Sequence, residues 1–140
     1  MANHETINST RAPEPVGLYP HARRVGNLLF LSGVGPRERG ANQIPGVELN
    51  DAGEILSYDI ETQCRSVFQN VRYILEDAGL SWDNIVDVTV FLTNMKDDFA
   101  TYNKIYAEYF AENRPCRTTV EVNALPTPIA IELKVIATIE

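Results

Sequence analysis

Arg117 and Glu132 are the residues of this sequence whose types and spacing could do chemistry together. They fall in two runs of strand period, 117–124 and 129–139, on either side of the breaker Leu125-Pro126-Thr127-Pro128. A guanidinium matches a carboxylate with two parallel hydrogen bonds, and a nearby carboxylic acid can move protons. The pair could therefore line a shallow carboxylate-binding site. A sheet face that is simply solvated has the same pattern, so the pattern alone leaves both interpretations open.

The two runs predict an antiparallel strand pair joined by a short turn, with one apolar and one polar face. The apolar face forms the core, and its members are Val120, Val122, Ala124, Ile131, Leu133, Val135, Ala137 and Ile139. The polar face holds Arg117, Thr119, Glu121, Asn123, Glu132 and Lys134. We therefore expect Arg117 and Glu132 to lie on neighbouring strands, on the sheet surface away from the core.

Two helices are predicted ahead of this strand pair. The first runs from Asp59, a suitable N-cap, to Ala78, and Gly79 is its C-terminal stop. Its apolar residues recur at helical spacing, and they are Ile60, Cys64, Val67, Val71, Ile74 and Ala78. The second helix is predicted to begin at Asp97 or Asp98 and to carry a stripe of bulky aromatic side chains.

Strands are predicted at 28–31 and 85–92, where short apolar or alternating runs lie between turn signals. The first ends at Ser32-Gly33, where a glycine lets the backbone approach a ligand or form a bulge. Residues 1–15 are predicted as a loosely held arm or a short edge strand. The order of these elements predicts one domain, 1–140, with an α+β sandwich whose helices cover one face of the sheet.

The stretch 35–53 is rich in Gly, Pro, Asn and charge, which predicts a long loop with a short hairpin near 47–55. A loop of this length inside a compact domain is usually functional or mobile. Arg37 and Arg39 could bring positive charge to a second anionic group of a ligand. Solvated surface arginines are the alternative interpretation.

Composition argues against several classes of function. The net charge of −7 and the pI near 4.8 argue against nucleic acid or an anionic membrane as a partner, because both need clustered Lys and Arg. Cys64 and Cys116 lack CxxC spacing, so we expect buried free thiols in a reducing cytoplasm. The two histidines, His4 and His21, lack ligand spacing, so we expect no metal. A leader or an apolar run of about 18 residues is absent, which predicts a soluble cytoplasmic protein.

Nucleophilic, metal and phosphoryl chemistry have no motif in the sequence, which lacks GxSxG, HExxH, a phosphate loop and a dinucleotide fingerprint. A carboxylate anchor and an acid/base residue are enough to hydrolyse an already activated C=N bond. That reaction requires positioning, one proton shuttle and release of ammonia, and it needs no cofactor.

The chain contains Pro115-Cys116-Arg117-Thr118-Thr119-Val120-Glu121-Val122, followed by Leu125-Pro126, Ile131-Glu132 and Ile136-Ala137. This signature resembles that of the reactive intermediate (enamine/imine) deaminase family, which is RidA/YjgF-like. Further matches are Val16-Gly17 with Tyr19, Gly26-Asn27, Leu31-Ser32-Gly33, Asn70-Val71, Ala78-Gly79-Leu80, Val88-Thr89-Val90-Phe91-Leu92, and Asp98-Phe99 with Asn103. The resemblance implies a chorismate-mutase-like fold with a mixed sheet, assembled as a homotrimer with active sites in the clefts between subunits.

The resemblance also implies roles for single residues. Arg117 would bind the substrate carboxylate, and Glu132 would hold and activate the attacking water and relay its proton to the departing nitrogen. The pocket would be completed by Tyr19, Ser32, Gly33, Asn103 and Thr119. The implied partners are a small carboxylate substrate and further copies of the same chain.

Within the family, the chain is most similar to the 2-aminomuconate deaminases, in the Val34-Gly35-Pro36-Arg37 start of the long loop. That similarity implies a C–N hydrolase that converts 2-aminomuconate to 4-oxalocrotonate and ammonia in bacterial degradation of aromatic compounds. Thr119 stands where broad-specificity members commonly carry Cys, and Leu18 stands where they carry Pro. The alternatives are a broad-specificity 2-iminobutanoate/2-iminopropanoate deaminase and a non-catalytic oligomer that binds small carboxylates or acts as a chaperone.

Overall fold

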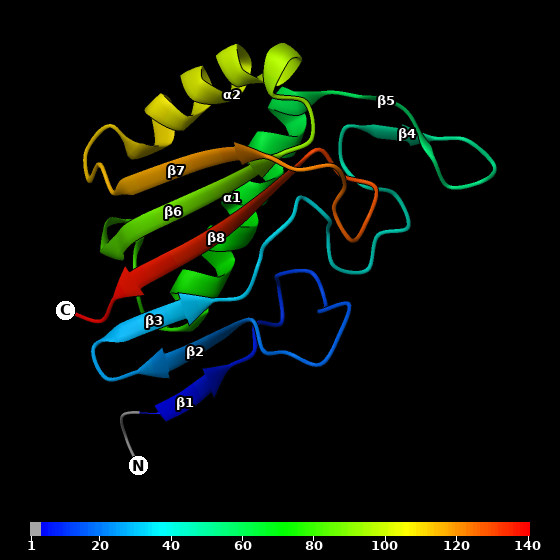
Figure 1. The fold of residues 1–140 in the computed structure, drawn as a ribbon. Helices are drawn as coiled ribbons and strands as arrows, with labels where there is room; N and C mark the ends of the chain where they lie inside the picture. The colour runs from blue at the N-terminus through cyan, green and yellow to red at the C-terminus, as the bar shows by residue number, and fades with distance from the viewer. Residues whose placement is uncertain (1–3) are drawn as a thin grey trace.

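The computed structural model describes residues 4–140. It contains a six-stranded sheet in the order β1-β2-β3-β8-β6-β7 and a separate two-stranded hairpin, β4-β5 (Figure 1). The strands are β1 (His4–Ile7), β2 (Ala22–Val25), β3 (Leu28–Leu31), β4 (Val47–Leu49), β5 (Ile55–Tyr58), β6 (Ile85–Leu92), β7 (Cys116–Glu121) and β8 (Ile131–Thr138). In the large sheet β6 and β7 are parallel and the other neighbours are antiparallel, so the sheet is mixed.

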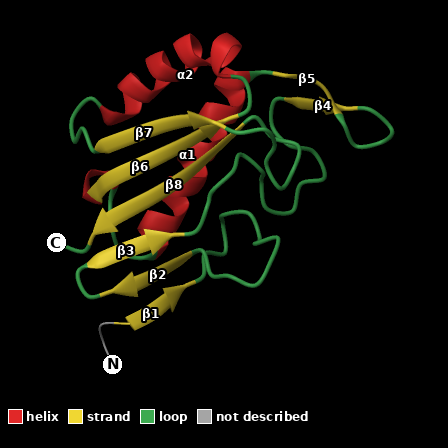
Figure 2. Cartoon of the chain, viewed as in Figure 1, coloured by secondary structure: helices red, strands yellow, loops and turns green. Residues whose placement is uncertain are grey.

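Both helices, α1 (Ile60–Asp77) and α2 (Met95–Phe110), pack on the same face of the large sheet (Figure 2). The core lies between the two layers. It includes Leu29, Leu31, Val88, Val90, Leu133 and Val135 from the sheet, and Cys64, Val67, Phe68, Val71, Tyr102 and Ile105 from the helices. The predicted α+β fold with two helices on one sheet face is confirmed.

Helix α1 forms where the sequence predicts it. The Asp59 carboxylate accepts a hydrogen bond from the backbone N–H of Thr62 at 3.3 Å, and Gly79, at φ +80°, follows the last turn. The predicted apolar stripe faces the sheet, and its buried members are Ile60, Cys64, Val67, Val71 and Ile74. Burial raises the pKa of the Cys64 thiol to about 12. Cys116, by contrast, is exposed, so its predicted burial is wrong.

Helix α2 begins earlier than predicted, because Asn94 caps it in place of Asp97 or Asp98. The Asn94 side-chain oxygen accepts a hydrogen bond from the backbone N–H of Asp97 at 3.1 Å. Asp98 is buried, and its carboxylate accepts a hydrogen bond from the Tyr58 hydroxyl at 2.6 Å. The side chain that resembles a cap in the sequence therefore ties the β4-β5 hairpin to α2.

The predicted antiparallel pairing of the last two strands is wrong, because β6 lies between β7 and β8. β7 runs parallel to β6, with Thr119 opposite Val90, and β8 runs antiparallel to β6, with Glu132 opposite Phe91. The physical reason is the crossover through α2, which returns the chain beside β6 in the same direction. The segment after β7 then has to pass the end of β6 before β8 can pair on its other side.

The predicted polar face is correct for β8 and inverted for β7. On β8, Ile131, Leu133 and Val135 are buried toward the helices, so Glu132 points to the opposite, open face. On β7, Arg117 and Thr119 contact side chains of α2 and therefore lie on the helix-covered face. Val120, predicted to be core, is 37% exposed. Polar residues of β7 can face α2 because the Asn103 amide and the Tyr106 ring contact the guanidinium of Arg117. The Tyr102 hydroxyl is hydrogen bonded to the hydroxyl of Thr119.

The N-terminal region forms two strands of the large sheet. Residues 4–7 form the edge strand β1, as predicted, whereas residues 1–3 of the predicted arm lie outside the described residues. β2 is not predicted by the sequence, because Arg23 and Arg24 interrupt its apolar pattern. The predicted hairpin near 47–55 is present as β4-β5.

No helix among residues 4–140 combines the length and the apolar character needed to cross a membrane. Within the described part of the chain, no group of three or more His, Cys, Asp and Glu side chains is placed to hold a metal ion.

Candidate functional site

Four of the predicted site residues line one hollow of about 380 Å³. They are Tyr19, Ser32, Gly33 and Glu132, and the hollow is completed by Val16, Gly35, Arg37, Pro126, Thr127 and Ile129. The end of β3, the open face of β8 and the connection before β8 meet there. A hollow of this volume is within the range of small-molecule sites.

Glu132 and Gly33 lie side by side in this hollow. Val34 and Leu133 exchange backbone hydrogen bonds of 2.8 and 2.9 Å, which fix the segment after β3 against β8. A Cβ on residue 33 would lie 2.5 Å from Oε2 of Glu132, so only glycine leaves room for the carboxylate in this position. Burial raises the pKa of Glu132 above its ordinary value. A carboxyl with a raised pKa is better suited to take and return a proton near neutral pH.

Ser32 and Tyr19 are oriented by backbone groups. The Ser32 hydroxyl donates to the carbonyl of Pro20 at 2.7 Å, so its oxygen is left as an acceptor toward the hollow. The Tyr19 hydroxyl accepts the backbone N–H of Val16 at 3.1 Å, so its own hydrogen remains available to a ligand. The rim therefore offers both an acceptor and a donor beside Glu132.

Arg117 belongs to a second group of residues, on β7 and α2. Its Nη1 donates to the side-chain oxygen of Asn103 at 2.7 Å. Its Cζ lies 4.8 Å from the ring centroid of Tyr106, 5.5 Å from that of Tyr102 and 6.0 Å from that of Phe99. The guanidinium of Arg117 is thus held against the aromatic rings of α2 and paired with the neutral amide oxygen of Asn103. Arg117 itself is exposed.

Thr119 lies two residues further along β7. Its hydroxyl and that of Tyr102 are 2.9 Å apart and hydrogen bonded. Because Tyr102 also lies against Arg117, Thr119 contacts a residue that supports the guanidinium. Its predicted contact with substrate stays a prediction.

The two groups face opposite sides of the sheet. Glu132 points to the open face of β8, whereas Arg117 points toward α2 from β7. Strand β6 lies between these two strands (Figure 1). The expectation that both residues share one surface of the chain is therefore wrong. The structure brings Tyr19, Ser32, Gly33 and Glu132 together, and it separately joins Asn103 to Arg117.

The aromatic support of Arg117 was missed in the sequence. Phe99, Tyr102 and Tyr106 match an ordinary buried helix stripe, and Tyr102 and Tyr106 are indeed buried. The available signal was Asn103, a polar residue beside that stripe, because positions three apart on a helix share a face. Its spacing to Tyr106 places both next to the same cation.

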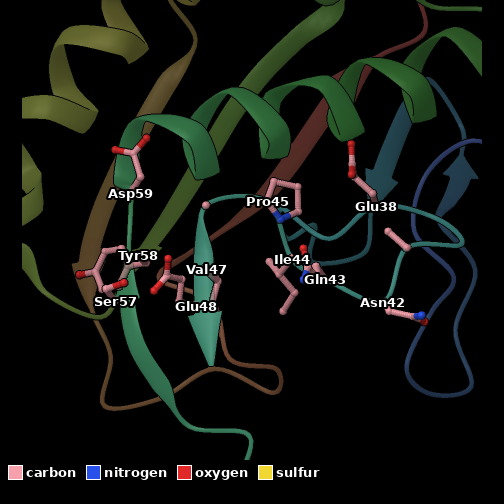
Figure 3. Close-up of a pocket in the computed structure, with 12 residues that line it drawn as sticks. Glu38, Asn42, Gln43, Ile44, Pro45, Val47, Glu48, Ser57, Tyr58 and Asp59 are labelled. Atoms are coloured by element: carbon pink, nitrogen blue, oxygen red, sulfur yellow. The ribbon is translucent and has the colours of Figure 1, made fainter. Parts of the chain in front are cut away.

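A larger hollow of about 900 Å³ lies between the loop after β3 and strand β5 (Figure 3). Its lining includes the acidic side chains Glu38, Glu48 and Asp59, and none of its lining residues is Lys or Arg. Asp59 is already occupied as the N-cap of α1. An acidic lining of this kind repels carboxylates, so this hollow does not suit a carboxylate ligand.

The sequence was compared with known families and proteins. A family model described as Endoribonuclease L-PSP matches residues 9–139. A RutC family protein from Pyrococcus horikoshii is 43% identical over 133 residues, which are 95% of this chain and 96% of that protein. Reactive Intermediate Deaminase A, chloroplastic, from Arabidopsis thaliana is 36% identical over 135 residues, which are 96% of this chain and 66% of that protein.

Solved structures share the fold. The crystal structure of E. coli TdcF with bound serine superimposes with a TM-score of 0.81 at 33% sequence identity, and the match covers 96% of this chain and 98% of that one. The likeness in fold therefore extends over nearly the whole chain.

Proposed function

Because the chain belongs to the reactive intermediate deaminase (RidA/YjgF-like) family, we propose that it hydrolyses the enamine or imine form of a 2-amino acid to a 2-oxo acid and ammonia. The name of the Arabidopsis relative supports this class of reaction. The serine bound to the E. coli relative supports a site for small molecules that carry a carboxylate and an amine. RNA hydrolysis, which the name of the family model mentions, is disfavoured by the net charge of −7.

The proposed active site forms between two copies of the chain, in a homotrimer. The observation that carries this proposal is that Arg117 and Glu132 face opposite sides of one sheet, so one copy offers each residue to a different neighbour. The open sheet face supports self-association, because Leu28 and Val120 are 39% and 37% exposed there. Excluding water from the cleft would strengthen the grip of Arg117 on an anion.

The proposed chemistry uses few groups. Arg117 and Asn103 of one copy hold the substrate carboxylate, and Glu132 of the neighbouring copy lies at the C=N carbon. After the enamine tautomerises to the imine, Glu132 takes a proton from water as the oxygen adds to that carbon. It returns that proton to the nitrogen, which gives a carbinolamine. Glu132 then moves the proton of the new hydroxyl to the amine nitrogen, so the C–N bond breaks and ammonia leaves as the carbonyl forms. The raised pKa of Glu132 suits both proton transfers.

The finer proposal is that the substrate is 2-aminomuconate, which would give 4-oxalocrotonate. The long loop that begins at Val34-Gly35-Pro36-Arg37 favours it, since Arg37 lines the hollow of Glu132. The second candidate is a broad-specificity deaminase of 2-iminobutanoate and 2-iminopropanoate, and the third is a carboxylate-binding oligomer without turnover.

The test is ammonia release from enamine acids that are generated enzymatically in the assay. Wild type should exceed the uncatalysed rate, and Arg117→Ala should lose nearly all of that excess while its thermal unfolding is unchanged. Lys104→Ala removes an exposed positive charge elsewhere on α2 and should behave as wild type. A wild type no faster than buffer would overturn the proposed activity, and full activity in Arg117→Ala would overturn the role of Arg117.

A further inference from the structure

The long loop after β3 brings a positive charge into the hollow of Glu132. Arg37 lines this hollow together with Tyr19, Ser32 and Gly33. Nothing in the proposed hydrolysis of a simple imine uses this cation, since Arg117 already holds the substrate carboxylate. Arg37 is therefore a charged group of the hollow that has no part in that reaction.

Arg37 has no counter-ion among residues 4–140. Its Nη2 donates to the backbone carbonyl of Glu14 at 2.9 Å, whereas the carboxylate of Glu14 pairs with Arg39 at 3.0 Å. Arg39 is further committed to backbone carbonyls, including that of Ser9 at 2.9 Å. Of the two loop arginines, only Arg37 can offer its charge to a ligand of this hollow.

The backbone that carries Arg37 is held in place by α1. The Asn70 side-chain amide donates to the carbonyl of Gly35 at 2.8 Å and to that of Arg37 at 2.7 Å. The Ser66 hydroxyl donates to the carbonyl of Pro36 at 2.7 Å. Three successive carbonyls are thus fixed to one helix. A cation presented from a fixed backbone binds with less loss of conformational freedom than one on a free loop.

We propose that Arg37 binds a second carboxylate of the substrate, so that the site selects dicarboxylic over monocarboxylic enamine and imine acids. This specificity rests on the proposed function, in which Arg117 of the neighbouring copy binds the first carboxylate. The two guanidinium groups then hold both ends of a short dicarboxylate, with Glu132 between them. A dianion needs such local cations here, because the chain as a whole carries a net charge of −7.

Direct binding tests the proposal without relying on turnover. Adipate and hexanoate are unreactive six-carbon acids with two carboxylates and one, and their binding to the assembled protein can be measured by calorimetry. Wild type should bind adipate more tightly than hexanoate. Arg37→Gln should lose about tenfold to 100-fold in adipate affinity relative to hexanoate, the range for one charged hydrogen-bonded contact. Arg37→Lys keeps the positive charge but loses the paired N–H donors of the guanidinium, so it should recover part of the lost adipate affinity.

Lys104→Gln is the charge-matched control, since it removes one exposed cation outside the hollow and should leave the adipate-to-hexanoate ratio unchanged. In turnover, Arg37→Gln should lower the ratio of kcat/KM for a dicarboxylic over a monocarboxylic enamine acid by the same factor, through KM. Equal losses for both ligands, or no loss, would overturn the proposal. Arg37-dependent adipate binding without ammonia release from any substrate would support the second-carboxylate site while refuting the deaminase activity.

Discussion

Asn103 accepts a hydrogen bond from Arg117 at 2.7 Å, on the side of the guanidinium that faces α2. The acceptor is a neutral amide oxygen, so it orients the cation without cancelling its charge. The ring of Tyr106 contacts the same guanidinium, and Cζ of Arg117 lies 4.8 Å from the centroid of that ring. Together they orient Arg117 for the substrate carboxylate that we propose as its ligand.

Substitution of Asn103 should therefore weaken substrate binding in a defined order. Asn103→Ala removes the orienting acceptor and should raise KM about tenfold, the equivalent of about 1.4 kcal/mol. Asn103→Asp should raise KM further, because its carboxylate would pair with Arg117 and compete with the substrate. Steady-state ammonia release measures both variants. A smaller effect for Asp than for Ala would mean that Arg117 does not bind an anion.

Gly33→Ala should displace the Glu132 carboxylate, since the new Cβ would lie 2.5 Å from Oε2. Gly33 does not have a positive φ, so alanine fits the backbone and the fold should survive. We expect kcat to fall about tenfold to 100-fold, as for a catalytic group moved by about 1 Å. In the Gly33→Ala protein, Glu132→Asp should cost less than in wild type, because the shorter side chain relieves the clash. Additive losses would show that the two positions are independent.

The stability of the protein should depend on Glu132 in a particular pH window. Burial raises the folded-state pKa of this carboxyl above its ordinary 4.5. Its contribution to the free energy of unfolding is therefore fully present below pH 4.5 and is lost as pH rises through the folded-state pKa. Glu132→Gln should therefore raise Tm at pH 7, and the gain should shrink at pH 4. Calorimetric unfolding of both proteins at the two pH values, with the oligomeric state checked, measures this. A lower Tm at pH 7 would mean that the charged carboxylate is compensated in the assembly.

Local patterns predicted most of the elements, because capping and periodicity act over a few residues. Asp59 marks the start of α1 and Gly79 marks its end. The alternation of apolar and polar residues over 85–92 predicts β6. The pairing of β7 was not predictable in this way. A run such as 116–121 has the same pattern whether its partner is β6 or β8, and only the crossover through α2 decides between them.

The candidate site was predicted residue by residue but not in its geometry. Family resemblance singled out Arg117, Glu132, Gly33 and Asn103, and the structure places each of them beside another member of the set. The prediction of which sheet face carries Arg117 was wrong, because an edge strand packed under an aromatic helix can turn polar side chains toward that helix. Whether the proposed site joins residues of two copies depends on assembly, which no local pattern encodes.

The assembly can be tested by mixing two inactive variants. If Arg117 of one copy serves the site that holds Glu132 of the next, then Arg117→Ala and Glu132→Gln each destroy every site in a homotrimer of their own. In mixed trimers, some sites lie between a Glu132→Gln copy and an Arg117→Ala copy. Such a site is complete when the first copy supplies its intact Arg117 and the second supplies its intact Glu132. Random mixing of equal amounts makes these complete sites about a quarter of the total.

Co-expressed and co-purified variants should therefore recover about a quarter of the wild-type rate of ammonia release, whereas each variant alone stays inactive. The double variant Arg117→Ala/Glu132→Gln, co-expressed with wild type, is the matched control. In that whole population of trimers, about a quarter of the sites should likewise be complete, those that lie between two wild-type copies. If the two residues act within one chain, the two single variants will not rescue each other, and the proposed site between subunits is wrong.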